Sequence, residues 1–202
     1  MRVKSMIVAA ACIIASVATP VYAEEGNKTI TAQPISQESG VAREERRKGE
    51  EYLARIEEMR QKREAQLAEY FDENDVIMLA QLIDIEAGGV YPLYRRAAVA
   101  WTVLNRLDSG RWGPTTISGI ITQPYQYAYY SERSYSDMNY RIAKHVLTSW
   151  ADEKISGKPN WRRVLPQCYE SFWGDGEQNH FYDQYENYWD FYVEYDPYEN
   201  WE

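Results

Sequence analysis

Apolar side chains between residues 71 and 182 recur three and four positions apart, which is the spacing of one face of an α-helix. The pattern predicts three long helices. The first begins after Asp72 or Asn74 and stops at Gly88-Gly89, the second extends over about residues 94–108, and the third over residues 137–154. Asp and Asn side chains cap helix starts and glycine ends helices, so these boundaries have a local physical cause.

The pattern is less regular between the second and third helices. Residues 115–123 predict a short helix, and residues 125–130, which are rich in tyrosine, predict an aromatic loop or hairpin. Strand signals are few. The chain therefore predicts an α-rich (α+β) domain over residues 71–182, preceded by a charged helix.

A charged segment, residues 43–70, precedes this domain. Of its first 22 positions, 15 are charged, and the two signs nearly balance. Acidic residues recur four positions before basic ones, as Glu44 does before Lys48. Pairs in this order support a solvated helix. The thin apolar stripe is broken at Arg63, so a spacer helix is favoured and a coiled-coil dimer is the alternative. The same helix is a candidate docking site for a protein partner.

Residues 1–23 predict a cleaved signal peptide. Arg2 and Lys4 form a basic start, the stretch from Met6 to Ala18 is apolar, and small residues stand where a signal peptidase would cleave. The apolar stretch is shorter than the ~20 residues that span a bilayer as a helix, so we expect no stable membrane anchor. Residues 24–42, rich in Thr, Ser, Gln, Gly and Pro, predict a linker. We therefore expect a secreted or cell-envelope protein.

The ionisable residues exclude several classes of function. With 31 acidic and 22 basic residues the formal charge is −9. This balance argues against nucleic acid as the main partner, because phosphate binding needs concentrated Lys and Arg. Two cysteines and two histidines are too few for a disulfide framework, a thiolate-rich zinc site or most polyhistidine metal centres. We expect neither a metal ion nor a cofactor.

The C-terminal part of the chain combines aromatic and acidic side chains. Residues 169–202 contain 13 aromatic and 10 acidic residues, and residues 183–202 form an acidic aromatic tail. One interpretation places Trp173, Phe181 and Tyr182 in the core and the rest in an amphipathic wrap. The other is a sugar-stacking surface, since Trp and Tyr offer flat apolar faces beside polar rims. The composition leaves both open.

Glu86 has an unusual predicted position for an acidic residue. It shares the apolar face of Leu82 and Ile83, in the last helical turn before Gly88-Gly89. Partial burial, the negative helix C-terminus and the lack of a basic residue within one turn would each raise the pKa of its carboxyl. A general acid for a glycosidic oxygen needs such a raised pKa near neutral pH. The simpler interpretation is a frayed helix end at which Glu86 points to water. Asp84 faces elsewhere, so it forms no evident carboxylate pair with Glu86.

Several motifs follow one another at compatible spacing over about residues 75–182. They are Leu79-Ala80-Gln81-Leu82-Ile83, Ile85-Glu86-Ala87-Gly88-Gly89, Ala97-Ala98-Val99-Ala100, Val103-Leu104-Asn105-Arg106-Leu107, Gly110-Arg111-Trp112, Thr116-Ile117-Ser118-Gly119-Ile120-Ile121, Gln123-Pro124-Tyr125-Gln126-Tyr127 and Asn179-His180-Phe181-Tyr182. Together they resemble the spore cortex-lytic enzyme family, also called SleB-type cell wall hydrolases. Such an ordered series is much more specific than any one motif.

The resemblance implies a compact α-rich fold related to lysozymes and lytic transglycosylases, with peptidoglycan glycan strands as substrate. The family's catalytic glutamate falls on Glu86. In the implied mechanism Glu86 protonates the glycosidic oxygen between muramic acid and glucosamine units, then acts as base on the muramic C6 hydroxyl, which closes a 1,6-anhydro ring. Gln126 and Tyr127 match a Gln-aromatic pair expected to line the sugar groove, with Tyr129 as a further candidate. His180 is expected to orient the groove or to satisfy a buried hydrogen bond.

Two other functions stay open. A zinc amidase would need about three His, Cys or carboxylate ligands in defined places, and only His145 and His180 are available as histidines. A non-catalytic peptidoglycan-binding envelope protein would keep the fold and hold sugar on Tyr and Trp faces. The sequence also leaves open whether the role lies in spore germination, in wall remodelling or in phage infection.

Overall fold

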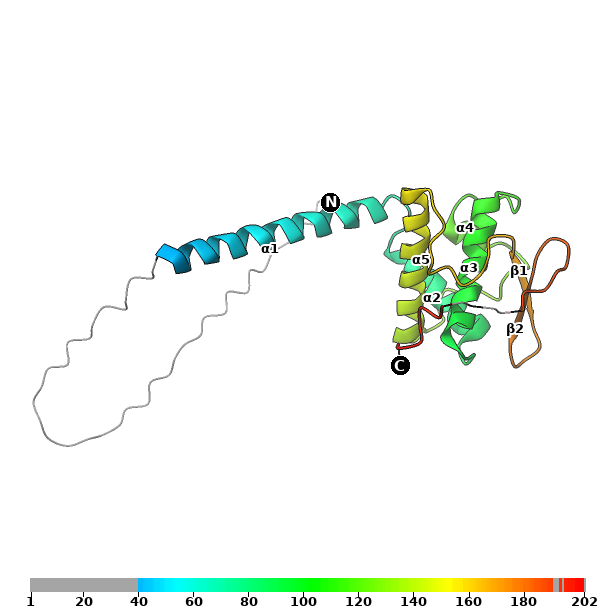
Figure 1. Ribbon diagram of the computed structural model, residues 1–202. Helices are drawn as coiled ribbons and strands as arrows, with labels where there is room; N and C mark the ends of the chain where they lie inside the picture. The colour runs from blue at the N-terminus through cyan, green and yellow to red at the C-terminus, as the bar shows by residue number, and fades with distance from the viewer. Residues whose placement is uncertain (1–39, 191–192, 194, 202) are drawn as a thin grey trace, which may run out of the picture. The chain divides into compact units, whose positions relative to one another are not determined.

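The computed structural model describes residues 40–190, 193 and 195–201 (Figure 1). The predicted signal peptide, residues 1–23, and the predicted linker as far as residue 39 lie outside these described residues. The chain divides into two compact units, Met1–Lys48 and Gly49–Glu202, and the second contains the whole predicted catalytic domain. Among the described helices, none combines the length and the apolar character needed to cross a bilayer.

Helix α1 extends over Gly40–Leu67 and buries none of its residues. It begins at Gly40 instead of residue 43, so the end of the predicted linker is helical. It ends at Leu67 instead of residue 70, because the N–H of Tyr70 bonds to the Leu67 carbonyl and tightens the last turn. In the first unit Glu44 forms an ion pair with Lys48 at 3.5 Å. Local pairs of this kind support a helix that has no buried face.

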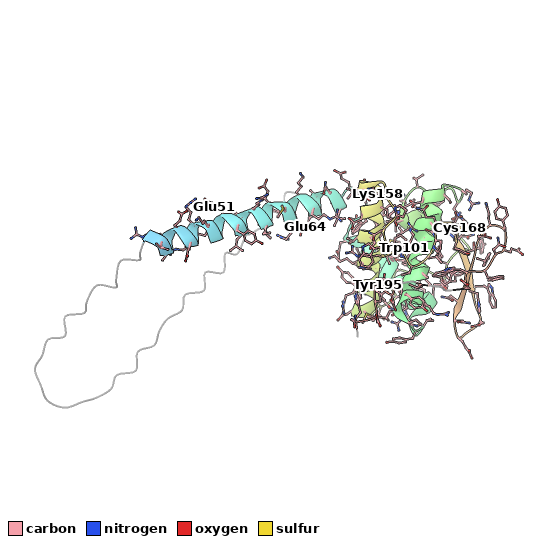
Figure 2. The ribbon with its side chains drawn as sticks, viewed as in Figure 1. Glu51, Glu64, Trp101, Lys158, Cys168 and Tyr195 are labelled. Atoms are coloured by element: carbon pink, nitrogen blue, oxygen red, sulfur yellow. The ribbon has the colours of Figure 1, made fainter. Side chains whose placement is uncertain are left out.

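Among the described residues, four helices form the core of the second unit. They are α2 over Glu73–Ala87, α3 over Leu93–Ser109, α4 over Ile117–Ile121 and α5 over Asp137–Ser156. Helix α2 packs against the other three, and α3 also packs against α4 and α5 (Figure 1). Their apolar side chains form one buried cluster, in which Trp101 of α3 is fully enclosed (Figure 2). The predicted α-rich fold is confirmed, and the three long helices lie close to their predicted bounds.

The helix ends follow local signals in the sequence. Asp72, not Asn74, caps α2. Its side chain accepts a hydrogen bond of 3.0 Å from the N–H of Asp75, and the side chain of Asp75 accepts one of 3.2 Å from the N–H of Asp72. Gly110 caps the end of α3 after Ser109: its left-handed backbone (φ +64°) directs its N–H to the Arg106 carbonyl. These local caps explain why the helix bounds could be predicted closely.

Strands β1 (Ser171–Gly174) and β2 (Asn179–Tyr182) pair as an antiparallel hairpin that the sequence pattern does not predict. Asn179 and Phe181 of β2 are buried, while His180 between them is only half-buried and lies opposite Trp173 of β1. Side chains therefore alternate between the core and an outer face. Four-residue strands are too short to show this alternation clearly in a sequence. In Figure 1 the hairpin is drawn on the far side of α3 from α5.

The packing of the domain continues past the predicted boundary at residue 182. Tyr198 is 2% exposed, and a hydrogen bond of 3.0 Å joins its hydroxyl to Nδ1 of His145 on α5. The ring of Trp201 meets the same imidazole edge-on at 5.1 Å. The described end of the acidic aromatic tail is thus part of the domain core, because its aromatic rings cover α5.

We expect the thermal stability of the protein to fall as the pH is lowered from about 6.5 to 4, in part through His145. Burial, with a smaller contribution from the charge of Arg162, lowers the pKa of His145 from 6.5 to about 4. In this window the unfolded chain binds a proton that the folded protein does not, so this contribution is full above pH 6.5 and is lost as the pH falls. Melting temperatures of the wild type and of His145→Gln across the window would show a shallower slope in the variant. Equal slopes would contradict the assignment to His145.

Candidate active site

Glu86 lies in the last turn of α2, half-buried, beside the fully buried Leu82 and Ile83. One oxygen of its carboxylate, Oε1, accepts a hydrogen bond of 2.9 Å from the backbone N–H of Ala128. The side-chain Nδ2 of Asn179 donates to the backbone carbonyl of Glu86 at 3.0 Å. The interaction with Asn179 satisfies a carbonyl that the helix end would otherwise leave unpaired. Glu86 is therefore held from two sides, by the loop after α4 and by the hairpin, which argues against a frayed helix end.

Two cavities meet at Glu86. The first, of about 350 Å³, is lined by Glu86, Arg106, Tyr125, Gln126, Tyr127, Ala128, Phe172, Trp173 and Gly174. The second, of about 210 Å³, is lined by Glu86, Val90, Gly174, Gly176, Glu177, Gln178 and Asn179. Because the two share Glu86 and Gly174, we treat them as one groove, called here the Glu86 groove. Space for a ligand thus exists on both sides of the carboxylate.

Tyr127 and Gln126 line the Glu86 groove together with Glu86. The Tyr127 hydroxyl forms a hydrogen bond of 3.1 Å with Oγ1 of Thr102, and burial raises the pKa of Tyr127 to about 12 against the opposing effect of the Arg106 charge. The phenol therefore stays protonated at neutral pH. Gln126 accepts a hydrogen bond of 3.1 Å from Nη1 of Arg106 through Oε1, which leaves its amide NH₂ as the polar group available to a ligand.

Arg106 supports this wall of the groove from behind. Its guanidinium is buried, donates to the Glu170 carbonyl at 2.6 Å, and lies 3.9 Å from the ring centroid of Trp112 and 4.7 Å from that of Tyr127. Burial lowers the pKa of Arg106, which the neighbouring Tyr127 and Glu170 oppose. Arg106 therefore holds the segment at Glu170 and the rings of Trp112 and Tyr127 together at this wall.

Tyr129 and His180 do not line either cavity at Glu86. The Tyr129 hydroxyl donates to Oε1 of Gln81 on α2 at 2.8 Å, and Gln81 in turn donates to the carbonyl of Ser131 at 2.8 Å. Tyr129 therefore fastens the loop to α2. His180 lies behind Trp173, with its ring stacked on the indole. The sequence pattern identified both residues but could not show which wall each one faces.

Trp173 and Tyr125 are groove residues that the sequence did not single out for this role. Trp173 is 47% exposed and lines the larger cavity, so it does not occupy the core position that one of the two interpretations of the sequence gave it. Tyr125 is fully exposed and has a left-handed backbone (φ +66°), which is uncommon for a non-glycine residue and is associated with functional sites. Its place within the Gln123-to-Tyr127 motif was the only available signal.

The acidic residues near Glu86 differ in their surroundings. Asp84 lies 3.0 Å from Nη2 of Arg133 and accepts a hydrogen bond of 3.0 Å from Asn139, so its carboxylate serves the packing of α2. Glu177, at the exposed turn of the hairpin, lines the smaller cavity. Within the described part of the chain, no group of three His, Cys, Asp or Glu side chains is placed to hold a metal ion.

Residues 94–191 match a family model described as Cell Wall Hydrolase. No curated protein and no solved structure matches the chain. The matched range begins after Glu86 and continues beyond Tyr182, so it includes the start of the acidic aromatic tail, which the motifs had left outside the resemblance.

Proposed function

We propose that this chain acts on peptidoglycan and cleaves the glycan strand with Glu86 as the catalytic acid, because residues 94–191 match the cell wall hydrolase family model. The cleaved bond in this proposal joins muramic acid to glucosamine. The observation that carries it is the position of Glu86, a half-buried carboxylate at the junction of two cavities. A polysaccharide chain needs space on both sides of the group that acts on it.

The contacts of Glu86 suit a group that donates and then accepts a proton. Oε1 is held by the N–H of Ala128, and among the residues that the structure describes no group donates a hydrogen bond to Oε2. We assign the transferable proton to Oε2. Because Ala128 and Asn179 restrain the residue, little reorganisation precedes the reaction.

The proposed reaction proceeds in two proton transfers. Glu86 first gives its proton to the glycosidic oxygen, and the bond to the muramic C1 breaks. The resulting carboxylate then takes the proton of the muramic C6 hydroxyl, whose oxygen forms a bond to C1 and closes the 1,6-anhydro ring. The carboxyl is protonated again at the end, so one residue completes the cycle as a lytic transglycosylase.

Mass spectrometry of the soluble products tests this proposal. The purified protein is incubated with sacculi and, separately, with spore cortex. Products that end in non-reducible 1,6-anhydromuramic acid are expected. Reducing muramic ends would replace the transglycosylase proposal by a hydrolase. Binding without release of any product would favour the non-catalytic peptidoglycan-binding protein, and release of free stem peptides would indicate an amidase.

One observation favours a two-carboxylate hydrolase as the second candidate. Glu177 lines the smaller cavity together with Glu86, and hydrolases that invert or retain configuration use a pair of carboxyl groups. Glu177→Gln separates the candidates. A transglycosylase keeps its rate in this variant, because no water has to be activated. If the protein is a hydrolase in which Glu177 is the base, the rate of the variant falls by about 10²–10⁴-fold.

The place of action proposed here is the cell envelope or its exterior, reached through the signal peptide predicted at residues 1–23. A comparison of release rates on cortex and on vegetative sacculi tests a role in spore germination. Helix α1 is proposed as a spacer, with a protein partner as the alternative, because it carries many charges and buries no residue.

A further inference from the structure

We propose that Trp173 stacks against a sugar ring of the substrate beside Glu86, and that Asp175 and His180 are positioning residues that hold the plane of its indole. This inference rests on the proposed function, since it names how the Glu86 groove holds a glycan. It assigns a role to the outer face of the hairpin, which the mechanism above does not use.

The indole of Trp173 has one covered face and one available face. The imidazole of His180, its partner across the hairpin, lies parallel to it, with ring centroids 4.4 Å apart and planes inclined by 18°. Trp173 is nevertheless 47% exposed and lines the larger cavity together with Glu86, Gln126 and Tyr127. The accessible surface therefore belongs to the side that His180 does not cover, next to the proposed acid.

A chain of hydrogen bonds keeps His180 in this position. Its Nε2 lies 2.7 Å from Oδ2 of Asp175, and the other oxygen of Asp175 accepts hydrogen bonds of 2.8 Å from the backbone N–H groups of Glu177 and Gln178. These contacts hold the pKa of Asp175 well below its usual range, with the His180 hydrogen bond as the main cause. The carboxylate thus links the geometry of the hairpin turn to the orientation of the imidazole, and through it to the indole.

The chemistry of the available surface fits a saccharide. A pyranose ring presents a face of C–H groups and a rim of hydroxyl and N-acetyl groups, and a flat indole matches the apolar face. Polar groups that could meet the rim surround the same cavity, among them the amide of Gln126 and the carboxyl of Glu86. An apolar platform with a few polar groups is typical of small-ligand sites.

Binding measurements on an inactive background test the stacking role. All variants carry Glu86→Gln, so that no cleavage occurs, and chitotetraose, a soluble oligomer of N-acetylglucosamine, is titrated by calorimetry. Trp173→Ala is expected to weaken binding about tenfold, and Trp173→Phe by about threefold or less. Trp161→Ala is the matched control, because Trp161 is also exposed but does not line the Glu86 groove. Equal affinities of Trp173→Ala and the parent would overturn the inference.

The positioning role is tested with active enzyme. His180→Ala and Asp175→Asn are expected to raise KM for soluble glycan fragments about threefold to tenfold with kcat nearly unchanged. His180→Phe keeps a ring against the indole, so its KM should stay close to the wild-type value. If the variants only lower the melting temperature and leave KM unchanged, the two residues are merely structural.

The outcomes also separate this inference from the proposed function. Binding of chitotetraose that depends on Trp173, without cleavage of sacculi by the wild type, would support the sugar platform and reject the enzyme. Cleavage of sacculi with no effect of Trp173→Ala on binding or KM would support the enzyme and reject the sugar platform.

Discussion

Glu86→Gln is expected to lower the release of soluble glycan fragments from sacculi by about 10²–10⁴-fold, the usual contribution of a general acid–base residue. Glutamine cannot give a proton to the glycosidic oxygen or take one from a C6 hydroxyl. Its amide oxygen can still accept the hydrogen bond from the N–H of Ala128 that Oε1 receives now at 2.9 Å. The variant should therefore remain folded, with the circular dichroism spectrum of the wild type and a similar melting temperature.

Glu69→Gln provides a matched control for this experiment. Glu69 is exposed and follows α1, so its substitution removes the same charge away from the groove and should leave the release rate unchanged. A folded Glu86→Gln protein that released fragments at the wild-type rate would contradict the assignment of Glu86 as the acid. The search for the proton donor would then turn to Glu177, the other carboxylate that borders the Glu86 groove.

Glu153→Ala is expected to reduce the free energy of unfolding by about 3–5 kcal/mol, since it leaves a buried guanidinium without its counter-charge. Oε2 of Glu153 lies 2.5 Å from Nη2 of Arg163, and both side chains are more than nine-tenths buried. Arg163 also donates to Oδ1 of Asn105 at 2.6 Å and covers the ring of Trp101 at 3.9 Å. The ion pair thus connects α5 and the segment after it to the centre of α3.

Urea denaturation followed by circular dichroism measures this effect. Glu57→Ala on α1 is the control, because it removes an ion pair of similar length, 2.7 Å to Arg60, from a solvent-exposed helix surface. Exposed pairs of this kind contribute little to stability, so the control should unfold near the wild-type midpoint. Similar midpoints for both variants would show that the buried pair adds no more than a surface pair.

Local chemistry made much of the fold predictable. The apolar side chains of α2, α3 and α5 repeat at helical spacing, and Asp72 and Gly110 mark two of the helix ends through bonds within a few residues. Glu86 could be placed on an apolar face near a helix end for the same reason, because its neighbours in the helix are also its neighbours in sequence. The order of the motifs, rather than any distance between them, indicated the family that residues 94–191 match.

The sequence by itself determined the helical segments and the position of Glu86 on its helix, and it indicated the family whose model residues 94–191 match. The tertiary structure alone decided which side chains meet Glu86. The hairpin places Trp173 in the lining of the Glu86 groove and stacks His180 on its indole, while the loop before α5 places Tyr127 in that lining and bonds Tyr129 to Gln81. These choices depend on contacts between residues 42 to 93 positions apart, such as those of Ala128 and Asn179 with Glu86. Helical periodicity reports only neighbours within a turn or two, so it contains no information about such contacts.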